Sequence, residues 1–266
     1  MIWTMDMPTE EDRLPRLGRH GTRLKELKQR VRSRRPGEVV ADGRRLVADL
    51  ARWGVPLREL YLAASLAGQA DMVQLVAAAG ECWAVDDAVL ADIAPTRHPQ
   101  GVLAIAAEPC LAPWPRRQGI GLYLDHVQEP GNVGAMVRSA AALGAGGVLL
   151  SPGCADPFHP AAVRASAGAV LRLPVEREVD LTGVAEELRA RGGEVWAAAA
   201  GGVPVERWRP GPPVLLLLGA EGQGLGEDAL ACADGSVTVP IERGVDSLNV
   251  GVAAAVLLHA FRQRRP

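Results

Sequence analysis

The sequence predicts an α/β protein in which a small α/β domain precedes a larger domain built on a parallel sheet. Apolar runs alternate with amphipathic helical spacing along most of the chain, and a proline-rich stretch at 109–119 interrupts this alternation. The apolar runs after that stretch are nearly continuous, as is typical of parallel strands covered by helices on both faces. We therefore divide the 266 residues into a flexible tail (1–20), a domain (21–108), a linker (109–119) and a domain (120–266).

The first domain begins with a helix, since Leu24, Leu27 and Val31 have helical spacing. A second helix is expected at 40–53, where Gly54 would end it. The remaining elements expected in this domain are a strand at 57–63, a helix at 69–79, a strand at 82–85, a helix capped by Asp86 or Asp87, and a strand at 101–106.

In the second domain, strands are expected at 120–124, 147–150, 194–198, 214–218 and 236–239. Helices are expected between them at 133–143, 161–170, 181–191, 227–233 and 248–262. The longest apolar runs are too short to span a bilayer. Polar side chains gather where strands of this domain end, and ligands bind at that edge in open α/β sheets.

The composition excludes several kinds of protein. Only 4% of the residues are aromatic, so stacking on exposed rings is not expected to be the main contact with a nucleic acid. The four cysteines are far apart, which argues against a metal site and a disulfide framework and indicates a reducing, cytoplasmic environment. Acidic residues near the start argue against a signal peptide.

Basic residues are concentrated between positions 13 and 45, although the formal net charge of the whole chain is −2. Such a block is typical of a surface that binds the phosphates of nucleic acid, and the arginine fork suits phosphate. A solvated helix face is the alternative. The candidate RNA-binding residues are Arg23, Lys28, Arg30, Arg32, Arg34 and Arg35.

The first polar block reads DHVQEPGNVGAMVRSA over 125–140. Glycines flank Asn132 where a helix begins, so backbone N–H groups there can face an anion. Arg138 follows further along the helix, and an arginine near a helix N-terminus can hold a phosphate. An ordinary asparagine cap and a surface arginine would explain the same residues.

The second block, LGAEGQGL at 218–225, follows an apolar strand. Its glycines resemble a dinucleotide-binding loop, but the carboxylate of Glu221 would repel a pyrophosphate. It better suits a ligand with hydroxyls or a cationic centre, and a plain tight turn is the alternative. The third block joins VPI at 239–241 to SLNV at 247–250, where Ser247 is expected to cap the last helix and Asn249 to lie in its first turn.

Together, in this order, the three blocks resemble the SpoU/TrmH family of RNA ribose 2′-O-methyltransferases. The resemblance covers about residues 120–264, and residues 21–108 also resemble the family's substrate-binding N-terminal domain. Glu129 stands where the family usually has aspartate, and Ile241 where methionine is frequent. Neither change removes a reactive group.

This resemblance implies methyl transfer from S-adenosylmethionine to structured RNA, with ribosomal RNA more expected than transfer RNA. It also implies a trefoil knot and a homodimer in which Arg138 of one subunit faces the cofactor of the other. The implied catalytic residues are Arg138, Asn132, Glu221, Ser247 and Asn249. The implied cofactor-binding residues are Leu218, Gly219, Ala220, Val239, Ile241, Leu248 and Asn249.

Two other functions are compatible with parts of the pattern. A non-catalytic RNA-binding or assembly factor could keep the fold, although the retained polar residues of the three blocks argue against it. A nicotinamide-dependent enzyme could use the glycine loop, but Glu221 and the late position of this loop in the chain disfavour it.

Overall fold

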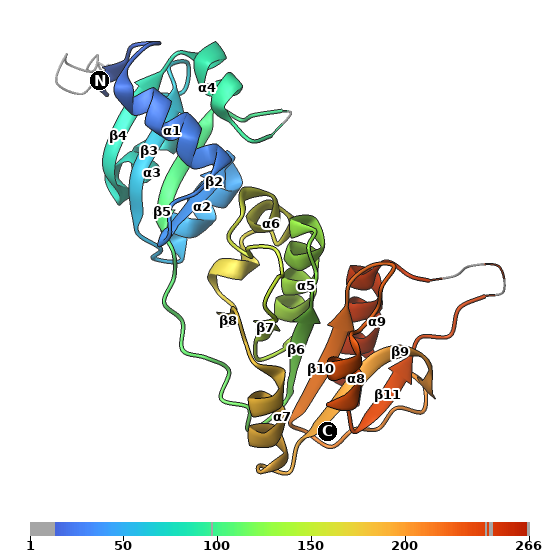
Figure 1. Cartoon of the computed structure of the whole chain (residues 1–266). Coiled ribbons are helices and arrows are strands. Elements are labelled where there is room, and N and C mark those ends of the chain that lie inside the picture. The colour runs from blue at the N-terminus through green and yellow to red at the C-terminus, as the bar shows by residue number, and fades with distance from the viewer. Residues whose placement is uncertain (1–13, 97, 243, 245–246, 265–266) are drawn as a thin grey trace, which may run out of the picture. The chain divides into compact units, whose positions relative to one another are not determined.

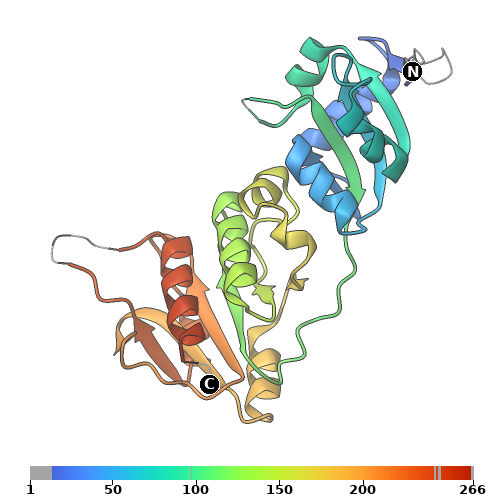
Figure 2. The same cartoon turned by 180° about the vertical axis from the view of Figure 1, so that it is seen from behind.

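The computed structural model describes residues 14–96, 98–242, 244 and 247–264. The chain divides between Pro109 and Cys110 into two compact units, and each is described by itself (Figures 1 and 2). Both units combine helices with one sheet, which confirms the predicted α/β class. Within the described residues, no helix is long and apolar enough to cross a membrane.

The N-terminal unit has a five-stranded mixed sheet in the order β1-β4-β3-β5-β2. β4 pairs in parallel with β1 and β3, whereas β5 is antiparallel to both β3 and β2. The elements are β1 (Arg16–Leu17), α1 (Thr22–Arg32), β2 (Glu38–Asp42), α2 (Arg44–Arg52), β3 (Leu57–Ala63), α3 (Ala70–Ala78), β4 (Ala79–Val85), α4 (Asp87–Ile93) and β5 (Val102–Ala107).

Two expectations for this unit need correction. The predicted helix at 40–53 begins only at Arg44, because Val39, Val40 and Ala41 are buried in β2 and pair with β5. Gly43, at a φ of 109°, turns the chain from this strand into α2. The predicted tail also contains β1, which pairs with β4, while residues 1–13 of that tail lie outside the described part of the chain.

The core of the unit follows from the periodicity of α1. Leu24, Leu27 and Val31 are buried in one cluster with Leu90 and Ile93 of α4. This cluster lies against one face of the sheet, where Tyr61 of β3 stacks on Trp83 of β4 with ring centroids 5.1 Å apart.

The C-terminal unit has a six-stranded sheet in the order β11-β9-β10-β6-β7-β8, and every pair in it is parallel. The carboxyl ends of all its strands therefore point to the same edge. The elements are β6 (Ile120–Asp125), α5 (Pro130–Leu143), β7 (Val148–Leu150), α6 (Pro160–Ala165), a 3-10 turn (Ala169–Leu171), β8 (Val175–Glu176), α7 (Leu181–Arg189), β9 (Glu194–Pro204), β10 (Val214–Gly219), α8 (Glu227–Ala231), β11 (Gly235–Thr238) and α9 (Val250–Arg262).

The helix predicted at 161–170 is interrupted. Ala167 has a φ of 49° and Gly168 a φ of 78°, and this left-handed backbone separates α6 from the 3-10 turn. Helix α5 begins earlier than expected, because Glu129 caps it and Pro130 occupies its first position.

Part of the predicted linker at 109–119 packs against the C-terminal unit. Trp114 is 3% exposed; its indole lies over Gly121 and Gly146, and its Cβ lies beside Gly147. Its Nε1 donates to the carbonyl of Gln118 at 3.3 Å. Arg116 pairs with Glu176 at 2.7 Å, so this stretch is held by a buried ring and an ion pair despite its three prolines.

Candidate functional site

A pocket of about 770 Å³ opens at the carboxyl ends of β10 and β11, beside the middle of β9. Its size is within the range that holds small molecules and cofactors. Small and apolar side chains and exposed backbone make up most of its wall. The lining residues are Ala198, Ala199, Ala200, Leu218, Gly219, Ala220, Glu221, Gly222, Gly224, Val237, Thr238, Val239, Ile241, Ser247, Leu248, Asn249, Val250, Ala253 and Leu257.

The loop after β10 folds tightly back on itself at this pocket. A Cβ on Gly219 would lie 2.1 Å from the carbonyl oxygen of Gly224, so only glycine permits the close approach. Gly222 and Gly224 have φ values of 81° and 71°, in the left-handed region that glycine adopts freely. The loop exposes backbone groups to the pocket, as a site for a cofactor with polar groups requires.

A buried carboxylate holds this loop to the neighbouring strand. Asp125, at the end of β6, is 5% exposed and accepts a hydrogen bond from the backbone N–H of Gly226 at 2.9 Å. Its other oxygen lies 2.8 Å from Nδ1 of His126. The end of β6 therefore fixes both the glycine loop and the start of the first polar block.

Three polar residues from the three sequence blocks meet at the mouth of the pocket. The side-chain amide of Asn249 donates to Oδ1 of Asn132 at 3.2 Å and also donates to the carboxylate of Glu221. Residues separated by more than a hundred positions in the sequence thus form one hydrogen-bonded cluster. Two of its members, Glu221 and Asn249, line the pocket itself.

The cap of α9 differs from the prediction. Asn249, not Ser247, caps the helix, because its side-chain oxygen accepts from the N–H groups of Gly251 at 3.0 Å and Val252 at 3.3 Å. The side-chain oxygen of Asn249 therefore caps α9, while its side-chain nitrogen donates hydrogen bonds to Asn132 and Glu221. Ser247 is exposed and lines the pocket.

Arg138 lies apart from this cluster. It is exposed on α5, and neither it nor Asn132 is among the residues that line the pocket. In the part of the chain that the structure describes, no hydrogen bond or ion pair holds its guanidinium.

All seven predicted cofactor-binding residues line the pocket, together with residues that the motifs did not indicate. The additional wall includes Ala198, Ala199 and Ala200 in the middle of β9 and Ala253 and Leu257 of α9. The sequence did contain a pattern that indicates the β9 residues, since the run AAAAGG at 197–202 gives the strand side chains too small to block a ligand.

The structure separates the basic residues predicted to bind RNA into buried residues and residues that solvent reaches. Arg30 is 5% exposed and donates to Glu38 and Glu59, and the side chain of Arg34 is 9% exposed and pairs with Glu108. This corrects the prediction for these two arginines, because opening a buried ion pair leaves a charge unpaired. Arg32 and Arg35 are exposed, whereas Arg23 and Lys28 are half-buried and pair with the exposed carboxylates of Glu81 and Asp92.

The network around Arg30 makes the stability of the N-terminal unit depend on pH. Burial alone would raise the pKa of Glu59, but hydrogen bonds from Tyr61 and Arg30 outweigh it and hold this pKa below its ordinary value. Such a carboxylate stabilises the fold above its unfolded pKa of about 4.3, and this stabilisation is lost as the pH falls through the folded pKa.

We therefore expect the wild-type chain to lose stability below about pH 4.3 more steeply than Glu59→Gln, whose amide does not titrate in this range. Urea midpoints at several pH values, followed by tryptophan fluorescence, measure the difference. Glu81→Gln, in the exposed pair with Arg23, is the control and should keep the wild-type pH dependence. Parallel curves for wild type and Glu59→Gln would contradict the assignment.

Comparisons with known proteins bear on both units. Residues 119–259 match the model of the SpoU rRNA Methylase family, and residues 22–104 match the MRM3-like substrate binding domain. Relatives include an uncharacterized tRNA/rRNA methyltransferase of Synechocystis sp., 32% identical over 72% of this chain and 71% of its own length. The 23S rRNA (guanosine(2553)-2′-O)-methyltransferase RlmP of Bacillus subtilis is 32% identical over 68% of this chain and 73% of its own length.

A solved structure of a methyltransferase is similar to this chain over both units. The SpoU methyltransferase AviRb from Streptomyces viridochromogenes, in complex with its cofactor AdoMet, superposes with a TM-score of 0.79 at 28% identity. The match covers 92% of this chain and 98% of that one. The chain therefore belongs to the SpoU rRNA Methylase family and is an S-adenosylmethionine-dependent RNA 2′-O-ribose methyltransferase.

Proposed function

We propose that the chain methylates a ribose 2′-hydroxyl of ribosomal RNA and works as a homodimer. The observation that carries this proposal is the hydrogen-bonded cluster of Asn132, Glu221 and Asn249 at the mouth of the glycine-lined pocket. The relative RlmP, a 23S rRNA methyltransferase, supports ribosomal RNA as the substrate. We assign 120–266 to catalysis, 21–108 to RNA binding and the intervening 109–119 to their connection. The trefoil knot remains a prediction.

The pocket suits S-adenosylmethionine in volume and in chemistry. The small side chains of β9 leave room for the cofactor, and the backbone of Gly219 and Ala220 offers hydrogen-bonding groups. We assign its binding to Leu218, Gly219, Ala220, Val239, Ile241, Leu248 and Asn249. A carboxylate at the rim, Glu221, favours a ligand with a positive centre. When bound, S-adenosylmethionine supplies an electrophilic methyl group on a sulfonium.

The chain's own residues position the RNA and stabilise charge. We assign to Arg138 the phosphate next to the target ribose and the oxygen that becomes negative during transfer. A guanidinium almost never loses its proton in a protein, so Arg138 is not assigned the role of base. Asn132 and Ser247 orient the ribose, and Glu221 keeps Asn249 in place through its hydrogen bond.

An exposed apolar face on α5 and α9 supports the homodimer. The two helices pack side by side. Val252 is 50% exposed and Val256 36% exposed one turn further along α9, and Ala141 and Ala142 of α5 are exposed as well. Exposed apolar side chains that form a contiguous patch mark interaction surfaces. We propose a second copy as that partner, with Arg138 of each copy directed to the other's pocket.

The proposed function is tested with purified protein, radiolabelled S-adenosylmethionine and unmodified transcripts of large- and small-subunit ribosomal RNA and of transfer RNA. We expect label in ribosomal RNA and a 2′-O-methyl group at one position, found by mapping. A complementary map of total RNA with and without the gene identifies the same position in cells. Label in transfer RNA alone, or in no RNA, would contradict the proposal.

The glycine loop provides a separate test of the cofactor site. Gly219→Ala places a Cβ against the backbone of Gly224 and Leu225, which cannot move aside as a flexible side chain can. Strain of this kind costs about 1–3 kcal/mol, so we expect S-adenosylmethionine to bind roughly 5- to 150-fold more weakly by calorimetry. Gly211→Ala, which meets only the end of the Glu194 side chain, should bind normally. Equal affinities for the two variants would exclude this loop from the site.

A further inference from the structure

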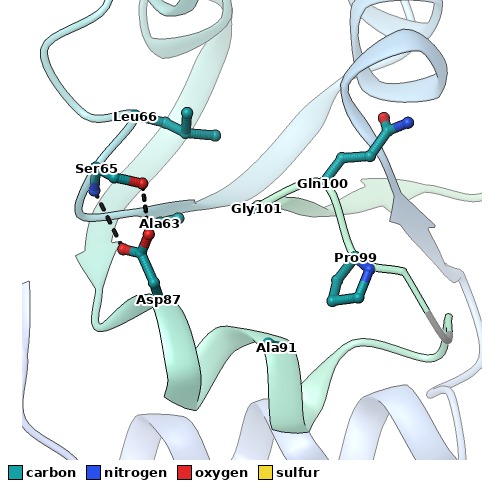
Figure 3. A pocket seen from close by; sticks show the side chains of 8 residues that line it. All are labelled: Ala63, Ser65, Leu66, Asp87, Ala91, Pro99, Gln100 and Gly101. Carbon is teal, nitrogen blue, oxygen red and sulfur yellow. Dashed lines mark hydrogen bonds between the residues drawn. The ribbon is translucent and has the colours of Figure 1, made fainter.

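The N-terminal unit contains a small pocket of about 260 Å³ at the carboxyl end of β3 (Figure 3). Asp87 of α4 accepts the backbone N–H of Ser65 at 3.1 Å with one oxygen and the Ser65 hydroxyl with the other. The side-chain oxygen of Gln100 accepts the backbone N–H of Arg44 at 3.0 Å. These polar atoms join the end of β3 to α4 and to the start of α2, so the pocket is part of the framework of this unit.

In the C-terminal unit, four arginines gather where helix α9 ends and where the chain leaves β9. Arg262 is the last residue of α9 and Arg264 follows it, while Arg207 and Arg209 lie in the turn after β9. The first three are exposed, apart from Arg264, which is half-buried. Nη2 of Arg264 donates to the carbonyl of Val205 at 2.7 Å, which brings the two segments together. We call these four residues the arginine cluster.

A buried tryptophan holds the turn after β9 in place. Trp208 is 0% exposed, and its ring centroid lies 5.9 Å from that of Trp196 in β9 and 6.1 Å from that of Phe261 in α9. Its two neighbours in the chain, Arg207 and Arg209, are exposed. The two arginines therefore extend to solvent from a turn that is anchored in the core of the unit.

The hydrogen bonds of these guanidiniums go to neutral oxygens. Nη1 of Arg209 donates to the carbonyls of Glu206 at 2.8 Å and Trp208 at 2.9 Å. Nη1 of Arg262 donates to the carbonyl of Ala142 at 3.3 Å. Such contacts orient a guanidinium without compensating its charge. Less side-chain entropy is then lost when an anion binds to its remaining N–H groups.

The positive charge of the cluster is not balanced by neighbouring acids. The segments 205–209 and 262–264 contain four positive charges and one negative charge. Among the residues that the structure describes, none forms an ion pair with an arginine of the cluster. By contrast, Arg189 of the same unit pairs with Asp234, and Arg191 pairs with Glu187. The cluster thus differs from arginines that the fold neutralises.

The fold holds two of these guanidiniums close together although they repel each other. Burial and the positive charge of Arg209 both hold the pKa of Arg264 below its ordinary value, and the charge of Glu206 offsets them only in part. An anion bound beside these side chains would relieve the repulsion. The cluster is therefore a surface that attracts anions.

Helix α9 connects the cluster to the cofactor pocket. It begins at Val250, which lines the pocket, and ends at Arg262. Its 13 residues span about 20 Å at a rise of 1.5 Å per residue. A structured RNA that presents one ribose to the pocket is large enough to extend over this distance.

We propose that the arginine cluster binds backbone phosphates of the RNA substrate, independently of base sequence, while the pocket holds the methyl donor. The planar arginine fork matches a phosphate, and contacts to phosphates position an RNA without reading its bases. A polyanion is favoured over a small anion, because it contacts several arginines at once and releases the counterions that its phosphates had bound. The inference rests on the proposed action on ribosomal RNA.

The test uses Arg207→Gln/Arg209→Gln in the full chain and measures the affinity for an unmodified ribosomal RNA transcript at several salt concentrations. Each lost phosphate contact should reduce the slope of log affinity against log salt by about 0.7–0.9. For one or two lost contacts, we expect the affinity at about 0.15 M salt to fall roughly 5- to 30-fold. The affinity for S-adenosylmethionine should stay at the wild-type value, which shows that the unit is folded.

Two control variants separate phosphate binding from net charge and from structure. Arg189→Gln/Arg191→Gln removes the same charge from arginines that are already paired, so it should bind within about twofold of wild type with an unchanged slope. Arg207→Lys/Arg209→Lys keeps the positive charges and should keep the wild-type slope. Equal losses in the paired-arginine control, or a slope in the lysine variant as low as in the glutamine variant, would overturn the proposal.

The outcome for the cluster is independent of the outcome for the proposed function. A reduced slope in the glutamine variant, without methylation of any ribosomal RNA by the wild type, would support the cluster and contradict the proposed function. Methylation of ribosomal RNA by the wild type, with unchanged affinity and slope in the glutamine variant, would overturn the cluster and leave the proposed function intact.

Discussion

Replacing Arg138 by alanine is expected to reduce methyl transfer about 10³-fold, the upper range for losing one group that stabilises charge in a transition state. Cofactor binding should persist, since Arg138 is exposed on α5 and does not line the pocket. Single-turnover methylation and calorimetry with S-adenosylmethionine measure the two properties separately. Arg164→Ala, another exposed arginine of the same unit, is the control. Loss of cofactor binding together with activity would contradict this role.

Mixing variants tests whether Arg138 acts on the partner's site. Arg138→Ala keeps its own pocket, and Gly219→Val, which disrupts the pocket, keeps its arginine. If Arg138 acts across the dimer, a heterodimer of the two has one complete site, and random mixing should restore about a quarter of the wild-type activity. If it acts within its own subunit, no heterodimer site is complete. If mass spectrometry shows heterodimers but methylation activity is not restored, the proposed dimeric site is contradicted.

Replacing Trp114 by alanine is expected to lower the free energy of unfolding of the C-terminal unit by about 3–5 kcal/mol, the usual cost of removing a buried tryptophan. Trp114 is 3% exposed, and its ring lies against Gly121 and Gly146. Urea unfolding measures the change. Leu111→Ala, at a 39% exposed position in the same segment, should cost less than about 0.5 kcal/mol. Equal costs would mean that the segment is a free linker.

A double-mutant cycle with Gly146 identifies the cause. A Cβ on Gly146 would lie 2.2 Å from Cδ1 of Trp114, so Gly146→Ala alone should be destabilising. When the indole is already absent, the same methyl group enters space that it vacated and should cost little. A strong favourable coupling between the two changes is therefore expected. Additive costs would show that the two residues do not contact each other.

The local sequence pattern was sufficient to predict helices and strands whose buried residues follow a regular spacing along the chain. The strands at 57–63 and 214–218 were predicted because apolar runs that end in a turn form buried strands, and β3 and β10 are there. The helix of Leu24, Leu27 and Val31 was predicted because its buried residues recur with the helical period. In these segments, the spacing of apolar residues along the chain indicates which side chains are buried, and this burial selects the helix or the strand.

Elements decided by distant pairing were not predicted. β1 has two residues and exists because Arg16 and Leu17 pair with Ala84 and Val85. Val40 and Ala41 suit a helix or a buried strand equally, and only the antiparallel register with β5 selects the strand. Arg30 resembles its basic neighbours in sequence, yet Glu38 and Glu59 surround it. Partners across a sheet are invisible to a local pattern.

The sequence by itself therefore determined the α/β class, the family and the three polar blocks, because these depend on residue type and short spacing. The tertiary structure decided that the amide of Asn249 joins Asn132 to Glu221, that Asn249 rather than Ser247 caps α9, and that Trp114 is buried. The physical reason is the parallel sheet. It brings strand ends from distant parts of the chain to one edge, where hydrogen bonds and packing select partners that spacing along the chain does not specify.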